Sequence, residues 1–414
     1  MNPTLFFVYL INGLVLYGLV RLVALQIKNE TVKKYFYPAL LFKLICTICI
    51  GLFYTLFYQG GDITSYFESG TELSKLPFSE YIKEITSSTS LSDPQRSIYF
   101  KRIVSVLIFF TKSDFWLTSL YFSLISFFGS CYFIIQLTKI YSKTTLPAII
   151  ALFFFPSIVF WSSSIIKEAM AFGCLLYFIG YSFKLIHSIK FKWYEIPISI
   201  LCLSLLILLK YYIAAAILPC LVLYFLMEIK VKISNLQWYS LSFFLAMAMV
   251  FGLHFMHPNF DPKWFFIAIE EARNSLIANS KPESIIQLYS GANILLAGVI
   301  NFFILLISGF FRPALFESFH FPIVLAGIEN TLLLFLFISR FFGKLSFEKK
   351  DLNLIIIVIT YTTFLALLLS YSSPNFGTLS RFKIYFMPFF LILILCNHPF
   401  IYWFDSSKKI KTIV

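Results

Sequence analysis

The chain has 414 residues, of which 59% are hydrophobic and only 13% are charged, and its mean hydropathy is +0.84. Soluble globular proteins carry about 25% charged residues, so this composition excludes a soluble globular protein and predicts an integral membrane protein. The net charge of +13 lies largely in short loops. It therefore indicates membrane topology, and we expect membrane lipids rather than nucleic acid as partners.

Repeated apolar runs of roughly 20 residues with short polar flanks predict an all-α, polytopic fold. We expect a single transmembrane domain over residues 1–414, with about 11 membrane-spanning helices. The predicted spans are 4–24, 36–58, 115–137, 145–161, 168–186, 196–209, 211–228, 238–256, 321–341, 352–371 and 380–397.

Basic clusters in the loops predict the orientation, because positively charged loops stay in the cytoplasm. The clusters alternate consistently if the N-terminus is outside and the C-terminus is inside. One further apolar stretch, 291–311, would break this alternation, so we expect a re-entrant or tilted segment there. The clusters are Lys28, Lys33 and Lys34; Lys139 and Lys143; Lys184, Lys190 and Lys192; Lys230 and Lys232; Arg340, Lys344, Lys349 and Lys350; and Lys408, Lys409 and Lys411.

Two long outer loops follow from this topology, at 59–114 and 257–320, and a short one at 372–381. The first loop contains a predicted amphipathic helix whose apolar side is formed by Phe78, Tyr81, Ile82 and Ile85. A second amphipathic pattern covers 98–110 after Asp93-Pro94, and a short helix is predicted over 264–278. Such helices lie along the membrane interface and can roof a cavity.

Asp62 follows the glycine pair Gly60-Gly61 at the point where an apolar run ends. The glycines permit a tight turn, and Tyr66, four residues later, lies on the same face of a helix. A carboxylate in this position is a candidate for chemistry on a lipid-borne substrate. The alternative is an outer-loop aspartate that caps a helix starting at Ile63.

A second candidate position lies in the short connection between two predicted spans, where Lys167 and Glu168 stand at the outer end of a helix. Residues 162–164 are serines that can supply the N-cap, and the helix dipole favours Glu168 there. In the functional interpretation Glu168 is a second acid or a metal-binding carboxylate. Lys167 is then a phosphate partner, and Trp161 a substrate-binding ring.

Three further cations are candidates for substrate binding. Lys210 interrupts an apolar run at its midpoint; as a hairpin apex it can instead extend toward the headgroups. Arg312 and Arg381 lie at outer ends of apolar segments, where an arginine can bind phosphate through two parallel donors or contact lipid headgroups. Glu329, within a span, is predicted to be an internal ion-pair partner.

An outer carboxylate, cations at headgroup depth and interfacial helices suit sugar transfer from a polyprenyl-phosphate-linked donor. In that reaction the acceptor hydroxyl loses a proton, and the charge of the departing lipid phosphate must be neutralised. The membrane supplies the donor.

This arrangement resembles the GT-C superfamily of multi-spanning glycosyltransferases that use lipid-linked sugars. The matching features are Asp62 and Tyr66 in the first outer loop with its interfacial helices, Glu168 after Pro156, and Arg381 before Pro388. The resemblance implies an enzyme of the bacterial inner membrane, with an active site facing outward, a polyprenyl-linked sugar donor and a glycan, lipid or protein acceptor.

The resemblance also implies roles for individual residues. Asp62 would be the catalytic base or an acid that orients the acceptor, and Glu168 a second acid. Arg312 or Arg381 would be the phosphate clamp. A divalent cation is a candidate cofactor, and metal dependence stays open.

Three alternatives stay open. The length, the number of spans and the paired late arginines also resemble oligosaccharide repeat-unit polymerases of outer-polysaccharide pathways. A transporter or flippase for a lipid-linked anion would gather Lys210, Arg312 and Arg381 around a cavity, although we see no internal halves in the sequence. A non-enzymatic assembly protein would have the charges scattered singly on loops.

Overall fold

The computed structural model describes residues 3–58, 60–87, 93–229, 237–238, 240, 243–244, 260–317, 320–342 and 351–401. These residues form helices and no strand. Within them, 8 helices are long and apolar enough to cross a membrane, or up to 9 if the pair Phe376–Tyr385 and Met387–Leu395, bent by 64°, counts as one span. The predicted all-α polytopic membrane fold is confirmed.

The chain divides into two compact units. The first contains Met1–Thr145, Leu152–Phe155 and Val159–Ala214, and the second contains Leu146–Ala151, Pro156–Ile158 and Ala215–Val414. The prediction of a single transmembrane domain stays a prediction.

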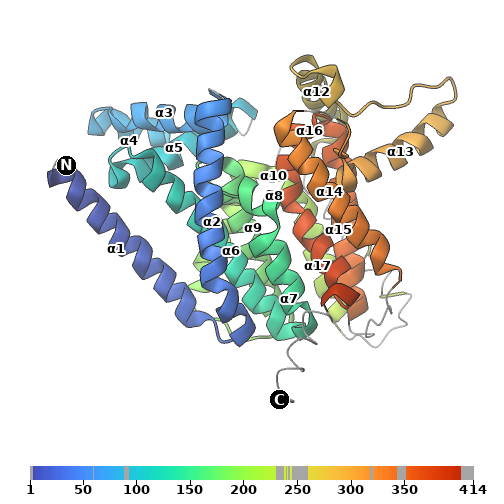
Figure 1. Cartoon of the computed structure of the whole chain (residues 1–414), viewed down its shortest axis with the longest axis horizontal. Coiled ribbons are helices and arrows are strands. Elements are labelled where there is room, and N and C mark those ends of the chain that lie inside the picture. The colour runs from blue at the N-terminus through green and yellow to red at the C-terminus, as the bar shows by residue number, and fades with distance from the viewer. Residues whose placement is uncertain are drawn as a thin grey trace. The chain divides into compact units, whose positions relative to one another are not determined.

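The first unit combines upright helices with shorter helices at one end. Figure 1 shows α3, α4 and α5 gathered at one end of α2, α6 and α9, while the turn between α1 and α2 lies at the other end. The helices predicted in 59–114 are thus present as α4 and α5, and α4 has the predicted amphipathic pattern whereas α5 over its full length does not. The helices of this unit are α1 (Pro3–Gln26), α2 (Glu30–Leu52), η1 (Phe53–Phe57), α3 (Asp62–Ser74), α4 (Phe78–Thr86), α5 (Asp93–Thr111), α6 (Phe115–Ile140), η2 (Ser142–Thr144), α9 (Lys167–Ile186) and the first part of α10 (Glu195–Glu228).

Helices α6 and α9 pack against each other through glycines. A Cβ atom on Gly129 would clash with the carbonyl of Gly173, and one on Gly173 would lie 2.6 Å from the carbonyl oxygen of Ile125. Small residues at such contacts let helix backbones approach closely inside membranes. This close approach fixes α9, whose first turn carries Lys167 and Glu168.

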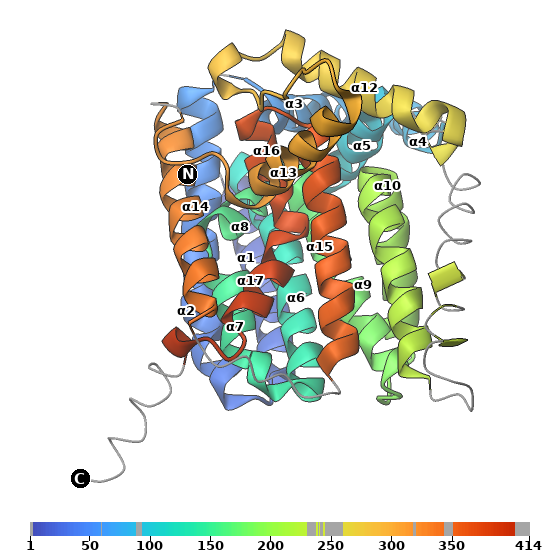
Figure 2. The ribbon, with the colours of Figure 1, turned by 90° about the vertical axis from the view of Figure 1, so that its right-hand side faces the viewer.

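The second unit is also helical. Figure 2 shows α14, α15 and α17 running side by side, with α12 across the end of α15. The rings of Phe310 and Phe390, whose centroids are 4.2 Å apart, join α13 to α17. The helix predicted over 264–278 is present as α12. The helices of this unit are α12 (Pro262–Ala278), η6 (Pro282–Ser284), α13 (Ile294–Phe311), α14 (Phe321–Arg340), α15 (Leu352–Ser372), α16 (Phe376–Phe382), η8 (Lys383–Tyr385) and α17 (Met387–Leu395).

Some predicted spans are not simple helices. The span predicted at 145–161 is divided into α7 (Thr145–Ile149), η3 (Ile150–Phe154) and α8 (Pro156–Trp161). Helix α10 has two helical runs joined across a kink at Lys210, where φ is −147° and ψ is 62°, so the break falls where it was predicted. The predicted span 238–256 lies almost entirely outside the described residues. Within the predicted stretch 291–311, residues 294–311 form the helix α13, and the re-entrant path stays a prediction.

Candidate functional site

A buried ion pair between α9 and α10 is the centre of a polar cluster in the first unit. The Nζ atom of Lys210 lies 2.7 Å from Oε1 of Glu168, and the side chains are 5% and 0% exposed. Glu168 belongs to the first turn of α9, where the helix dipole favours a negative charge. Buried charges are costly unless they are paired, so each group keeps the other in place. The predicted extension of Lys210 toward the headgroups is wrong.

Lys167 connects α9 to α3 and α5. Its Nζ atom lies 3.2 Å from the Ser97 hydroxyl and 5.4 Å from the centroid of the Tyr66 ring. Tyr66 is 4% exposed and packs edge-on against Phe100, with ring centroids 4.9 Å apart. The fold therefore brings together Tyr66 and Lys167, which the sequence proposed separately.

Two tyrosines after the kink in α10 face cations. The guanidinium carbon of Arg96 lies 4.7 Å from the centroid of the Tyr211 ring, and the Nζ atom of Lys210 lies 5.8 Å from that of Tyr212. Such cation–π contacts orient a charge without neutralising it. Arg96 was missed in the sequence. Its position in the first turn of α5, shortly after the Asp93-Pro94 start, is the feature of the sequence that could have pointed to it.

Asp62 begins α3 directly after the predicted glycine turn. Gly60 and Gly61 have φ angles of 140° and 98°, a backbone conformation that favours glycine. Gly61 occupies the N-cap position and Asp62 is the first residue of the helix, so the predicted capping role of Asp62 is wrong. Asp62 is half-buried and lies four residues before Tyr66 in the same helix, which places both on one face as predicted.

The predicted N-cap of α9 is also wrong. The cap position is Ile166, which makes no side-chain cap hydrogen bond, while the serines at 162–164 are buried. The backbone N–H of Ser164 donates to the hydroxyl of Ser123 at 2.8 Å, which anchors this connection to α6. Trp161, at the end of α8, is half-buried and packs edge-on against Phe160, with centroids 5.0 Å apart.

Lys43, in the apolar run of α2, is a buried cation that the sequence analysis did not single out. It is 3% exposed, and its Nζ atom donates to the Ser162 carbonyl at 2.6 Å and to the Ser162 hydroxyl at 2.7 Å. A third bond of 3.3 Å reaches the carbonyl of Val159. Lys43 therefore satisfies backbone acceptors where α8 ends, and it fixes the connection that leads to Lys167 and Glu168.

The two predicted arginines belong to the second unit. Arg312 follows α13, and its Nε atom pairs with Oε1 of Glu317, so a bound phosphate would compete with a carboxylate. Its guanidinium carbon lies 5.0 Å from the centroid of the Phe376 ring. Arg381, in α16, is half-buried, and its guanidinium carbon lies 5.6 Å from the centroid of the Phe382 ring.

Lys383 supports the segment that carries Arg312. It is 5% exposed, and its Nζ atom donates to the carbonyls of Arg312 and Phe310 at 2.6 and 3.2 Å. These are acceptors left over at the C-terminal end of α13. Glu329 accepts a hydrogen bond of 2.8 Å from the backbone N–H of Ser157.

The described part of the chain contains no group of three or more His, Cys, Asp or Glu side chains placed to hold a metal ion. Metal dependence stays open. No protein-family model, no curated protein and no solved structure matches the chain. Its function has to be inferred from the side chains described above.

Proposed function

We propose that the chain is a membrane glycosyltransferase that moves a sugar from a polyprenyl-linked donor to an acceptor on the extracytoplasmic face of the bacterial inner membrane. The observation that carries the proposal is a set of three cations in the first unit: Lys210 pairs with the buried carboxylate of Glu168, Lys167 lies near the Tyr66 ring, and Arg96 lies near the Tyr211 ring. Arginine and lysine side chains bind phosphates through charge-assisted hydrogen bonds, so this set of cations favours an anionic group such as a phosphate or diphosphate. Helices α3 and α5 contact Lys167 through Tyr66 and Ser97.

In this proposal the cations neutralise the phosphate of the departing lipid. Lys167 and Arg96, which lie near the rings of Tyr66 and Tyr211, are the cations proposed to contact it. Electrostatic stabilisation of a leaving group in a site that excludes water is a large contribution to catalysis. Lys210 is engaged with Glu168, and this pair holds α9 and the kink of α10 in register.

Asp62 is proposed as the general base. It accepts the proton of the acceptor hydroxyl while the acceptor oxygen bonds to the anomeric carbon of the sugar and the bond from that carbon to the phosphate oxygen breaks. Glu168 is the second acid. If the acceptor is itself a lipid-linked glycan, the same chemistry is that of a repeat-unit polymerase.

A transfer assay in nanodiscs tests the proposal. The wild-type protein is offered a panel of polyprenyl-phosphate and polyprenyl-diphosphate sugars, and we expect turnover with one of them. Asp62→Asn should abolish transfer, and Lys167→Met should reduce it about a hundredfold, the magnitude found when one stabilising donor is removed. Lys83→Met, which removes an exposed cation on α4, is the matched control and should transfer normally. Normal transfer by Asp62→Asn would contradict the proposed base.

A transporter or flippase of a lipid-linked anion is the second candidate, and broken helices favour it. Helix α10 is kinked at Lys210, and Phe376–Tyr385 and Met387–Leu395 meet at 64°. Interrupted helices often form the binding sites of transporters. Tight donor binding without turnover, equal in wild type and Asp62→Asn, together with movement of a labelled lipid-linked sugar across liposomes, would favour this candidate.

A further inference from the structure

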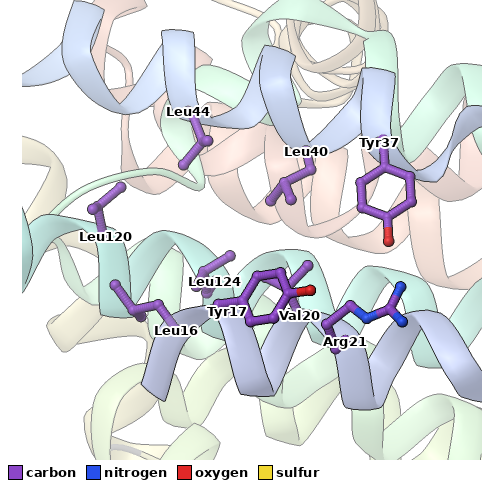
Figure 3. A pocket seen from close by; sticks show the side chains of 9 residues that line it. All are labelled: Leu16, Tyr17, Val20, Arg21, Tyr37, Leu40, Leu44, Leu120 and Leu124. Carbon is purple, nitrogen blue, oxygen red and sulfur yellow. The ribbon is translucent and has the colours of Figure 1, made fainter. Parts of the chain in front are cut away.

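Helices α1, α2 and α6 of the first unit enclose a cavity of about 300 Å³ that contains none of the predicted site residues (Figure 3). The volume falls at the small end of the range for ligand pockets, roughly 300 to 1,000 Å³. The cavity therefore has room for part of a small molecule or for a hydrocarbon chain.

The lining of the cavity is almost entirely apolar, and Arg21 and Tyr37 lie at one end of it. Figure 3 shows Leu16, Leu44 and Leu120 at one end, and Tyr37 and Arg21 pointing toward each other at the other end. The Tyr37 hydroxyl is hydrogen-bonded to the Arg21 guanidinium. Tyr37 and Leu44 are seven residues apart in α2, which corresponds to about 10 Å at 1.5 Å per residue. An apolar cavity with a cation at one end matches an amphiphile whose hydrocarbon chain lies along the cavity and whose charged head lies at Arg21.

Helix α1 is held in place at the far side of the cavity by polar contacts. The hydroxyl of Tyr9 donates to Asp114 at 2.5 Å, and the amide of Asn12 donates to the carbonyl of Phe110 at 3.0 Å. The 18-residue apolar window of α1 is only 6% buried. Because α1 is fixed at this point and otherwise faces lipid, the space beside Leu16 is open to the hydrocarbon of the membrane.

We propose that this cavity binds one anionic phospholipid, with an acyl chain along Leu16 and Leu44 and the phosphate held by Arg21. An arginine fork can donate two parallel hydrogen bonds to a phosphate. The exposed cations Lys28, Lys33 and Lys34 lie in the turn and first turns of α2 at the same end, and clusters of this kind attract anionic lipids.

This lipid is distinct from the donor in the proposed function. Arg21 lies toward the turn between α1 and α2, at the end of the first unit opposite α3, α4 and α5 (Figure 1). The phospholipid therefore belongs to the leaflet at that end and does not take part in transfer.

Native mass spectrometry of the full chain tests the proposal with two probes that share the same acyl chains, phosphatidylglycerol and phosphatidylcholine. The wild type should retain one phosphatidylglycerol in preference to phosphatidylcholine. Arg21→Ala should weaken this binding about fivefold, the effect of one cation beside an anionic lipid. Leu44→Trp should abolish it by filling the apolar end. Two matched controls should bind like the wild type: Lys190→Ala removes an exposed loop cation, and Leu41→Trp enlarges a residue of α2 that is 60% exposed.

Several results would overturn the proposal. Equal retention of the two phospholipids, or unchanged binding by Arg21→Ala and Leu44→Trp, would remove the site. Displacement of phosphatidylglycerol by an equimolar polyprenyl phosphate would show a prenyl-lipid site instead, and lipid-resistant dimers would show that a second copy covers the cavity. The unfolding midpoint of each variant is measured alongside. Arg21→Gln, which removes the charge but keeps a polar side chain, replaces Arg21→Ala if the latter does not fold.

Discussion

Removing one charge of the Glu168–Lys210 pair should destabilise the first unit strongly. The atoms are 2.7 Å apart and the side chains are 0% and 5% exposed, so the remaining charge cannot be solvated in place. Breaking such a buried pair costs about 3–5 kcal/mol, a large fraction of the roughly 5–15 kcal/mol that stabilises a folded domain. At about 2–4 °C per kcal/mol, Glu168→Gln should lower the unfolding midpoint in nanodiscs by roughly 10 °C.

A second pair between the same two helices provides the matched control. Lys184 in the last turn of α9 lies 2.6 Å from Glu195 in the first turn of α10, and the side chains are 6% and 7% exposed. Its burial and geometry are comparable, but it lies at the opposite end of α9 from Lys167. Glu195→Gln should therefore lower the unfolding midpoint by a similar amount and leave transfer by the folded protein unchanged.

The double variant Glu168→Leu/Lys210→Met separates a structural role from a catalytic one. Replacing both members of a buried pair by apolar residues is often neutral or stabilising, so the unfolding midpoint should return to about the wild-type value. If the pair belongs to the transfer site, activity does not return with it. Wild-type transfer by the double variant would refute the catalytic role of Glu168, and a wild-type midpoint in Glu168→Gln would refute the energetic reasoning.

Two further predictions concern stability. Gly129→Ala should lower the free energy of unfolding by about 1–3 kcal/mol, because the new methyl group meets the backbone of α9. Gly13→Ala, which has no atom within 4 Å of the new methyl group, is the control and should cost nothing. Equal unfolding midpoints of the two variants would contradict the close packing. Burial lowers the pKa of His398 below its ordinary 6.5, and its Nδ1 atom accepts the N–H of Phe400 at 3.1 Å. Since the unfolded chain binds this proton at higher pH, stability should be lost as pH falls from 6.5 through the lowered pKa; the same loss in His398→Phe would assign it to other groups.

The features that the sequence predicted correctly depend on neighbours along the chain. The stripe that begins at Phe78 predicted α4, and the Asp93-Pro94 start predicted α5. The glycine pair at 60–61 predicted the turn before α3, because its φ angles favour glycine. Periodicity and turn chemistry are local, so a single sequence is sufficient for them.

The composition of the site could not be predicted in the same way. The Nζ atom of Lys167 meets Ser97, 70 residues earlier in the chain, and the Nζ atom of Lys43 meets carbonyls 116 and 119 residues later. No pattern in a window of one helix encodes such contacts. The serines after Trp161 illustrate the difficulty: their composition suits an N-cap, but tertiary contacts with α2 and α6 use their polar atoms instead.

Two buried lysines, Lys43 and Lys383, follow a common rule that sequence analysis can use, and a third, Lys210, lies at a helix break and pairs with Glu168. Lys43 donates to carbonyls where α8 ends, Lys383 donates to carbonyls where α13 ends, and Lys210 occupies the kink of α10. In a membrane, backbone acceptors released by a helix end need an internal donor, and a lysine inside an apolar helix needs acceptors for its charge. The lysine therefore supplies the donor that the helix end lacks, and the helix end supplies the acceptors that the lysine needs. A lysine in a predicted span therefore indicates an interrupted helix nearby in space, and in this chain the interruption near Lys43 and Lys210 leads directly to Lys167 and Glu168.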